Sequence, residues 1–217
     1  GKLALFRNES NGKEGRPFVD VTATLGLKDE SWSTSAGRAD IDGDGFPELY
    51  VCHYLDWSFA NNPLCKGQIP GMERDVCPPQ QFKPLRHALF RNDKGQSFTN
   101  VSAEHNFKPD GCGLGVVLVD LNDDGQPDVH VANDVSLNFL FFNRKGKLEE
   151  RGFLSGAALD DNGHYNSSMG TDAADHNGSG KPSLWVSNFQ GELHGLYSNS
   201  GREVFRHRSR FVGIGAL

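Results

Sequence analysis

The stretch DIDGDGFPELYVCHY, residues 40–54, joins an acidic, glycine-containing loop to an apolar segment that follows it directly. The same order recurs as DLNDDGQPDVHVAND at residues 120–134 and as DHNGSGKPSLWVSNF at residues 175–189. Short apolar segments bounded by Gly, Pro and Asp are typical of β-strands. The recurrence therefore predicts several β-structured units of one design.

A tetrad of Leu, an aromatic residue, any residue and Asn accompanies these stretches, at residues 5–8, 89–92, 140–143 and 196–199. The second and third intervals between tetrads are both a little over about 50 residues, which leaves room for about four short strands. A period of this size is typical of β-propeller blades. We predict an all-β fold of four-stranded antiparallel blades; the alternative is a β-sandwich whose strands are similar by accident.

The tetrads divide the chain into units at about residues 5–88, 89–139 and 140–195, with a partial unit at 196–217. The first unit is longer because it contains a Pro-rich inserted loop at residues 55–86. Three to four blades are fewer than most closed propellers contain. We therefore expect residues 1–217 to form part of one propeller domain, whose end blades are covered by the remainder of the propeller or by another chain.

Composition narrows the range of partners. The chain has 26 Gly and 10 Pro residues, which disfavours long helices. Its 22 basic and 28 acidic residues give a net charge of −6, which argues against a nucleic-acid partner. No apolar run approaches the roughly 18 residues needed to cross a bilayer, so we expect no membrane span.

The acidic loop DIDGDGFPE alternates carboxylates with other residues ahead of a glycine. Carboxylates at the first, third and fifth places of a tight loop converge on one point, and the seventh-place carbonyl and ninth-place acid complete the shell. The candidate metal ligands are Asp40, Asp42, Asp44, the Phe46 carbonyl and Glu48. This set of hard oxygen donors favours Ca²⁺ over Mg²⁺, which requires stricter octahedral geometry.

Two further loops repeat this pattern with fewer charges. Their candidate ligands are Asp120, Asn122, Asp124, the Gln126 carbonyl and Asp128 in the second loop, and Asp175, Asn177, Ser179 and the Lys181 carbonyl in the third, where Ser183 holds the ninth place. Calcium affinity rises with the number of charged ligands. The expected order of affinity is first, second, third; the third loop is either empty or assisted by Asp172.

These loops have two alternative interpretations, as EF-hands or as turns without metal. An EF-hand requires a Glu at the twelfth place, where this chain has Val51, Val131 and Val186. The loops could also be solvated turns without metal, because Asp and Gly favour turns in any case. Two well-matched copies in the same position favour the calcium interpretation, with a structural rather than catalytic ion.

The four cysteines allow three pairings. Cys65 and Cys77 both lie in the inserted loop, where a disulfide would stabilise a segment that has little core of its own. We predict that pair. Cys52 and Cys112 are left either as a bridge between blades or as two buried thiols.

Several phrases resemble the FG-GAP (VCBS) repeats of the cartilage acidic protein and ASPIC/UnbV group: LFRN, GLGVV at residues 113–117, VAND at 131–134, VSNF at 186–189, and the insert phrases HYLDWS at 53–58 and CPPQ at 77–80. The resemblance covers nearly the whole chain. It implies an integrin-like propeller of about seven blades outside the cytoplasm. It also implies Ca²⁺ in the blade loops, at positions matching Asp40, Asp42, Asp44, Glu48, Asp120, Asn122, Asp124 and Asp128.

These observations favour a non-catalytic, calcium-binding propeller segment that is extracellular or periplasmic and serves recognition or adhesion. Its ligand would be a protein or glycan at a cell surface, and the inserted loop, with Trp57, Phe59 and Phe82, is the candidate contact region. One alternative is an enzyme acting on polysaccharides, a lyase or hydrolase, which would need an acid or base outside the ion loops. Another is a purely structural module of a large surface assembly.

Overall fold

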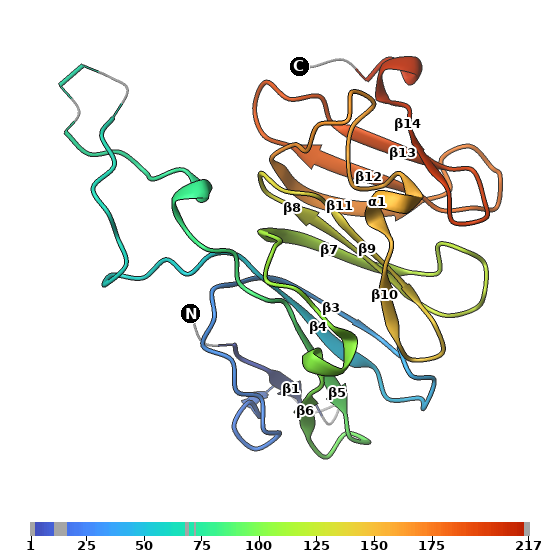
Figure 1. Cartoon of the computed structure of the whole chain (residues 1–217). Helices are drawn as coiled ribbons and strands as arrows, with labels where there is room; N and C mark the ends of the chain where they lie inside the picture. Colours follow the sequence, from blue (N-terminus) through green and yellow to red (C-terminus); the bar gives the residue numbers. More distant parts are fainter. Residues whose placement is uncertain (1–2, 11–16, 68–69, 72, 215–217) are drawn as a thin grey trace.

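A computed structural model describes residues 3–10, 17–67, 70–71 and 73–214 (Figure 1). The first sheet contains β3 (Ser33–Ala39), β4 (Glu48–His53), β5 (Ala88–Asn92) and β6 (Phe98–Asn100). The second contains β7 (Gly113–Val119), β8 (Asp128–Asn133), β9 (Phe139–Asn143) and β10 (Leu148–Glu150). The third contains β11 (Ser168–Ala174), β12 (Ser183–Asn188), β13 (Gly195–Asn199) and β14 (Phe205–His207).

An N-terminal hairpin, β1 (Phe6–Asn8) and β2 (Phe18–Asp20), precedes the three sheets. Helical segments are short: α1 (Gly152–Ser155) and the 3-10 turns η1 (Pro79–Gln81), η2 (Ser102–His105) and η3 (Ser209–Val212). None of the helices among the described residues has the length or apolar character needed to cross a membrane. In every sheet, each strand pairs antiparallel with the next strand along the chain. The prediction of an all-β fold built from four-stranded antiparallel sheets is confirmed.

The three sheets stack, with their first strands β3, β7 and β11 side by side (Figure 1). Glycine makes the closest approach possible, because a Cβ on Gly115 of β7 would lie 2.8 Å from the Cα of Gly170 on β11. Strands β4 and β8 are buried along their whole length. The buried positions include polar residues, Glu48 and His53 on β4 and Asp128, His130 and Asn133 on β8, so both strands are covered on both faces although their sequences are not continuously apolar.

Each interface between layers has its own hydrophobic core. Tyr50 of the first sheet packs with Val129 and Phe141 of the second. Leu140 of the second packs with Val186 of the third. The N-terminal hairpin region covers the other side of the first sheet through a third cluster, which contains Leu27, Leu49, Val51, Ala88, Phe90 and Phe98. The cores therefore form between sheets rather than within any one of them.

The tetrads lie on the third strands of the sheets, and the first of them lies on β1 of the hairpin. Their Asn side chains connect neighbouring sheets. The Nδ2 of Asn143 donates to the Ile41 carbonyl of the first acidic loop at 2.8 Å. The Nδ2 of Asn199 donates to the Leu121 carbonyl of the second loop at 2.7 Å. A unit counted from tetrad to tetrad thus contains the last two strands of one sheet and the first two strands of the next.

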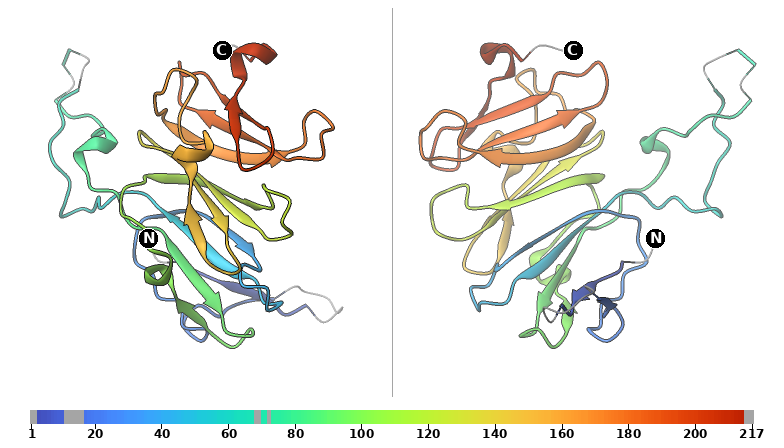
Figure 2. Two further views of the ribbon diagram at one scale, coloured as in Figure 1. Left: turned by 45° about the vertical axis from the view of Figure 1, so that its right-hand side comes forward. Right: turned by 180° about the vertical axis from the view of Figure 1, so that it is seen from behind.

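The inserted loop, residues 55–86, projects away from the stacked sheets (Figure 2). Its base is a short antiparallel ladder in which the Asp56 N–H donates to the Lys83 carbonyl at 3.0 Å. Farther out, a disulfide joins Cys65 to Cys77, which confirms the predicted pair. Cys52 and Cys112 are buried free thiols, so the alternative of a bridge between blades is wrong.

Side-chain contacts of His53 and Tyr54 secure the base of the inserted loop. His53 contacts the Asp29 carboxylate through Nε2 at 2.6 Å, and its Nδ1 faces the Arg86 carbonyl. The Tyr54 hydroxyl donates to Asp134 at the end of β8. Burial and the Asp134 charge both raise the pKa of Tyr54, so it remains a protonated donor. The loop is therefore anchored to both the first and the second sheet.

Candidate metal centre

The first acidic loop connects β3 to β4, and its side chains fold back onto its own backbone. The two carboxylate oxygens of Asp40 accept hydrogen bonds from Gly43 N at 2.9 Å and Gly45 N at 3.0 Å. Asp42 and Asp44 each accept from the N–H two residues ahead, at 3.1 and 2.8 Å. Gly43 and Gly45 have φ of 78° and 89°, values at which a side chain would be strained. The sequence forms this loop because Asp and Gly alternate.

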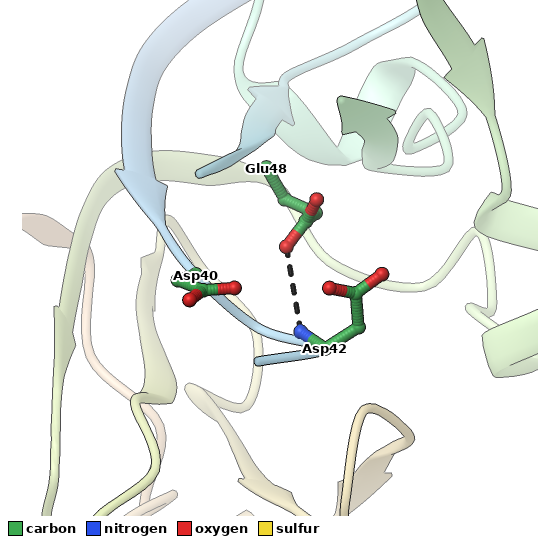
Figure 3. A group of neighbouring side chains, drawn as sticks. All are labelled: Asp40, Asp42 and Glu48. Carbon is green, nitrogen blue, oxygen red and sulfur yellow. Dashed lines mark hydrogen bonds between the residues drawn. The ribbon is translucent and has the colours of Figure 1, made fainter. Parts of the chain in front are cut away.

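Glu48, the first residue of β4, points its carboxylate toward the loop at Asp42 (Figure 3). It is 2% exposed, and its carboxylate accepts from Ile41 N at 2.8 Å, Asp42 N at 3.4 Å and Asn92 N at 3.2 Å. Burial raises its pKa, and the neighbouring Asp42 charge adds to this effect. Glu48 is thus a carboxylate held in place by backbone donors, and its burial disfavours the ionised form.

Asp40, Asp42 and Glu48 form the acidic group that best fits a metal ion in the described part of the chain. One carboxylate oxygen from each lies within 4.8 Å of the others. None of the ion pairs found among the described residues involves these three acids. The donor set therefore fits a hard divalent cation, and Ca²⁺ is the ion that prefers such oxygens in an irregular shell.

Asp44, another predicted ligand of this loop, is placed differently. Asp44 lies outside the group of three, and its Oδ1 accepts from the backbone N–H of Phe46. The Phe46 side chain is 37% exposed at the loop surface. The structure thus brings together the first, third and ninth places of the motif.

The second acidic loop, between β7 and β8, repeats the hydrogen bonds of the first. Asp120 accepts from Asp123 N and Gly125 N, both at 2.7 Å. Asn122 Oδ1 accepts from Asp124 N at 3.2 Å, and Asp124 accepts from Gln126 N at 2.9 Å. Asn122 also uses its Nδ2 to reach Glu203, which lies near the third sheet.

Asp128, at the ninth place of the second loop, is completely buried. It accepts from Leu121 N at 2.9 Å and Asn143 N at 2.8 Å. Burial raises the pKa of Asp128 to about 7, and the charges of Asp124 and Asp120 add to the rise. A cation in this loop would favour the ionised carboxylate, so the second loop also fits one, with one fewer acid than the first.

The third loop, between β11 and β12, keeps the backbone design with few charges. Asp175 accepts from Ser179 N at 3.0 Å and Gly180 N at 2.7 Å, and Asn177 Oδ1 accepts from Ser179 N at 3.1 Å. Ser179 Oγ accepts from Lys181 N at 3.3 Å. Backbone hydrogen bonds lower the pKa of Asp175, and the bond from Gly180 has the largest effect. Asp172 lies on β11, where its Oδ1 accepts from Ala173 N.

The ninth residue has a role that the sequence analysis did not anticipate. Glu48, Asp128 and Ser183 each accept the backbone N–H of the tetrad Asn on the third strand of the same sheet: Asn92, Asn143 and Asn199. The sequence contains a signal for this contact, because one tetrad follows each acidic loop. The ninth place therefore joins the loop to the sheet whether or not it carries charge.

Comparison of the chain with models of known protein families found no match, and comparison with curated proteins found none either. The geometry of the loops and sheets therefore provides the basis for a functional proposal.

Proposed function

We propose that this chain is a non-catalytic, calcium-binding segment of an FG-GAP (VCBS) type β-propeller. The observation that carries the proposal is the group of oxygens that Asp40, Asp42 and Glu48 present in the β3–β4 loop. A bound Ca²⁺ would neutralise acids that repel one another and so stabilise the connection between two strands. In the second loop, Asp120, Asn122, Asp124 and Asp128 would hold the ion.

The arrangement of the sheets supports a propeller. All three sheets have the same strand order, and their first strands β3, β7 and β11 are neighbours, as inner strands around a common axis would be (Figure 2). The tetrad Asn side chains join each acidic loop to the next sheet. The same contacts repeat from one interface to the next, as expected when equivalent blades pack face to face.

The face of the third sheet that points away from the second sheet is a candidate surface for a further partner. Ile41 and Leu121, at the second place of the first two loops, are each 2% exposed because the neighbouring sheet covers them. His176, at the same place in the third loop, is exposed. We propose that another sheet covers this face, from the remainder of the propeller or from another chain.

Calcium titration followed by isothermal calorimetry tests the metal proposal. The unmodified chain should bind Ca²⁺ at the first loop most tightly, and Asp42→Asn should remove that binding. Asp123→Asn is the matched control, since it removes the same charge from an exposed residue outside the ligand places of the second loop. Absence of calcium binding to the unmodified chain, or equal losses from both variants, would refute the metal site.

We also propose that the inserted loop mediates recognition outside the cytoplasm. Its disulfide is of a kind that persists in oxidising compartments. Two of its aromatic rings continue a series that begins at Trp32, just before β3: the Trp32 and Trp57 centroids are 5.6 Å apart, and those of Trp57 and Phe59 are 5.3 Å apart. Phe59 is 92% exposed, and an exposed aromatic side chain on a projecting loop is typical of a contact surface for a protein or glycan.

Cell-surface binding and glycan arrays test this role. The chain should bind, and Phe59→Ala should abolish most of the signal. Phe211→Ala is the control, because Phe211 is 72% exposed on η3, far along the chain from the inserted loop. If the control lowers binding as much as Phe59→Ala, the inserted loop is not the contact region.

A further inference from the structure

A pocket of about 610 Å³ opens between the first and second sheets. One wall is the segment around η2, from His105 to Asp110, and the other is formed by β9, β10 and α1. The two walls are joined where the Leu148 N–H donates to His105 Nδ1 at 3.1 Å. None of the acidic-loop ligands lines this pocket. Its volume lies in the range of small-molecule sites, about 300–1,000 Å³.

Aromatic rings form the floor of the pocket. Phe141 is central, with its ring centroid 5.1 Å from Phe107, 5.7 Å from Phe139 and 6.3 Å from Tyr50. The Tyr50 hydroxyl is bonded to His87 Nδ1 at 2.9 Å, so it is already satisfied inside the protein. Burial lowers the pKa of His87 to about 3, which leaves this ring uncharged at neutral pH. The floor therefore offers ring faces and edges rather than a charge.

The rim of the pocket is apolar in part and balanced in charge. Phe153 and Leu137 are 63% and 40% exposed at the mouth, so a bound molecule could cover apolar surface that now faces water. The charged rim residues are three cations and three acids: Lys108, Arg144, Lys147, Asp110, Glu149 and Glu150. Arg144 is already paired with Glu149 and Glu203, and Glu150 accepts the Gly152 N–H at 2.7 Å.

Charge and shape together define the ligand class. Because the rim charges balance, neither an anion nor a cation gains a net electrostatic advantage at the mouth. Rings whose centroids lie 5–6 Å apart, in tilted and edge-on arrangements, present faces and edges against which a further ring can pack. We propose that this pocket binds an uncharged aromatic compound of one or two rings. This activity is independent of calcium and of the inserted loop.

Ligand-observed NMR titration with 2-naphthol, an uncharged two-ring probe, tests the proposal. We expect saturable binding with a Kd of roughly 100 µM, a typical value for a molecule of this size. Phe153→Ala should weaken binding about tenfold, because it removes one ring from the mouth. The matched control is Leu154→Ala, on the next residue of α1, which is 70% exposed and does not line the pocket.

2-Naphthoate, which has the same rings and a negative charge, provides the test of ligand class and should bind at least several-fold more weakly. Because Phe153 and Leu154 are both exposed, neither substitution should disturb folding, and circular dichroism would verify this. Binding of 2-naphthol that does not saturate, or that both variants weaken equally, would exclude the pocket. Equal affinity for 2-naphthoate would overturn the assignment to uncharged compounds.

Discussion

The first and third acidic loops share one backbone design and differ in charge. In both, the first-place Asp accepts from the N–H five residues ahead, at 3.0 Å in the first loop and 2.7 Å in the third. In both, the ninth residue accepts the N–H of the tetrad Asn. The first loop has four acids where the third has one. The shape of the loop thus depends on hydrogen bonds to the backbone. The additional carboxylates of the first loop are not needed for that shape, so they have a different role.

This comparison separates the two roles of the ninth residue. Ser183 supplies an oxygen to Asn199 N without charge. Glu48 supplies the same kind of bond and also stands within 4.8 Å of Asp40 and Asp42 oxygens. A buried carboxylate is costly where a hydroxyl suffices, so its presence is explained if a cation compensates for it.

The largest effect of a single substitution should come from removing the ninth residue, measured by urea unfolding in chelator. Glu48→Ala leaves the buried N–H groups of Ile41 and Asn92 without their acceptor and should cost about 3 kcal/mol. Ser183→Ala removes the acceptor of one N–H and should cost about 1 kcal/mol. Glu48→Gln, which keeps an oxygen, should lie between them. Equal losses for the two alanine variants would mean that the ninth residues have equivalent structural roles.

The pH dependence of stability should differ between the second and third loops when metal is absent. The folded pKa of Asp128 is raised to about 7, whereas the unfolded value is near 3.8. The protonated form is therefore favoured in the folded state, and its contribution is complete below about pH 4. As pH rises from 4 to 7 this contribution is lost, at up to about 1.4 kcal/mol per pH unit.

Urea unfolding in chelator at several pH values measures this loss. Asp128→Asn should flatten the profile between pH 4 and 7, because the amide does not titrate. Ser183 has no ionisable group at the equivalent place, so Ser183→Ala should leave the profile unchanged in shape. Calcium should reverse the trend in the unmodified chain, since the ion favours the ionised carboxylate. A flat profile for the unmodified chain would contradict the role given to Asp128 burial.

Restoring acids to the third loop should create a calcium site. The double variant Asn177→Asp with Ser179→Asp gives this loop the alternation of the first loop, on a backbone that already has the same hydrogen bonds. We expect one additional Ca²⁺ per chain by calorimetry and a calcium-dependent stabilisation of about 2–3 kcal/mol at 100 times Kd. Unchanged stoichiometry would show that the ninth place decides binding, and adding Ser183→Asp would then test that place.

The sequence predicted local features better than contacts between sheets. Strands such as Asp128–Asn133 follow from short segments that contain several apolar residues and begin directly after a Pro, and the acidic loops follow from the spacing of their acids. The bond from Asn143 to the Ile41 carbonyl did not follow, because it joins residues far apart in the chain. The aromatic pocket was missed for a similar reason. Phe107 and Phe141 each have the pattern of ordinary core residues, and only the packing of two sheets shows that a space is left between them and the surface.

The smallest effect should come from the support that one sheet gives to the next sheet's loop. Asn143 braces the first loop through the Ile41 carbonyl, and Asn199 braces the second through the Leu121 carbonyl. Asn143→Ala should weaken calcium binding at the first loop about threefold, because the loop loses a bond that restricts its motion. Asn199→Ala should leave the first loop unchanged and weaken the second by a similar factor.

Calorimetric titration of the two variants distinguishes bracing from general destabilisation. A general loss of stability would lower both affinities in both variants, whereas bracing predicts that each substitution affects only the loop it contacts. The third loop supplies the internal reference, because His176, at the place of Ile41 and Leu121, is exposed and no described sheet covers it. If each loop's affinity depends on the neighbouring sheet, then the third loop, for which we expect the weakest binding, differs from the first in two respects: it has fewer acids, and no sheet among the described residues covers it.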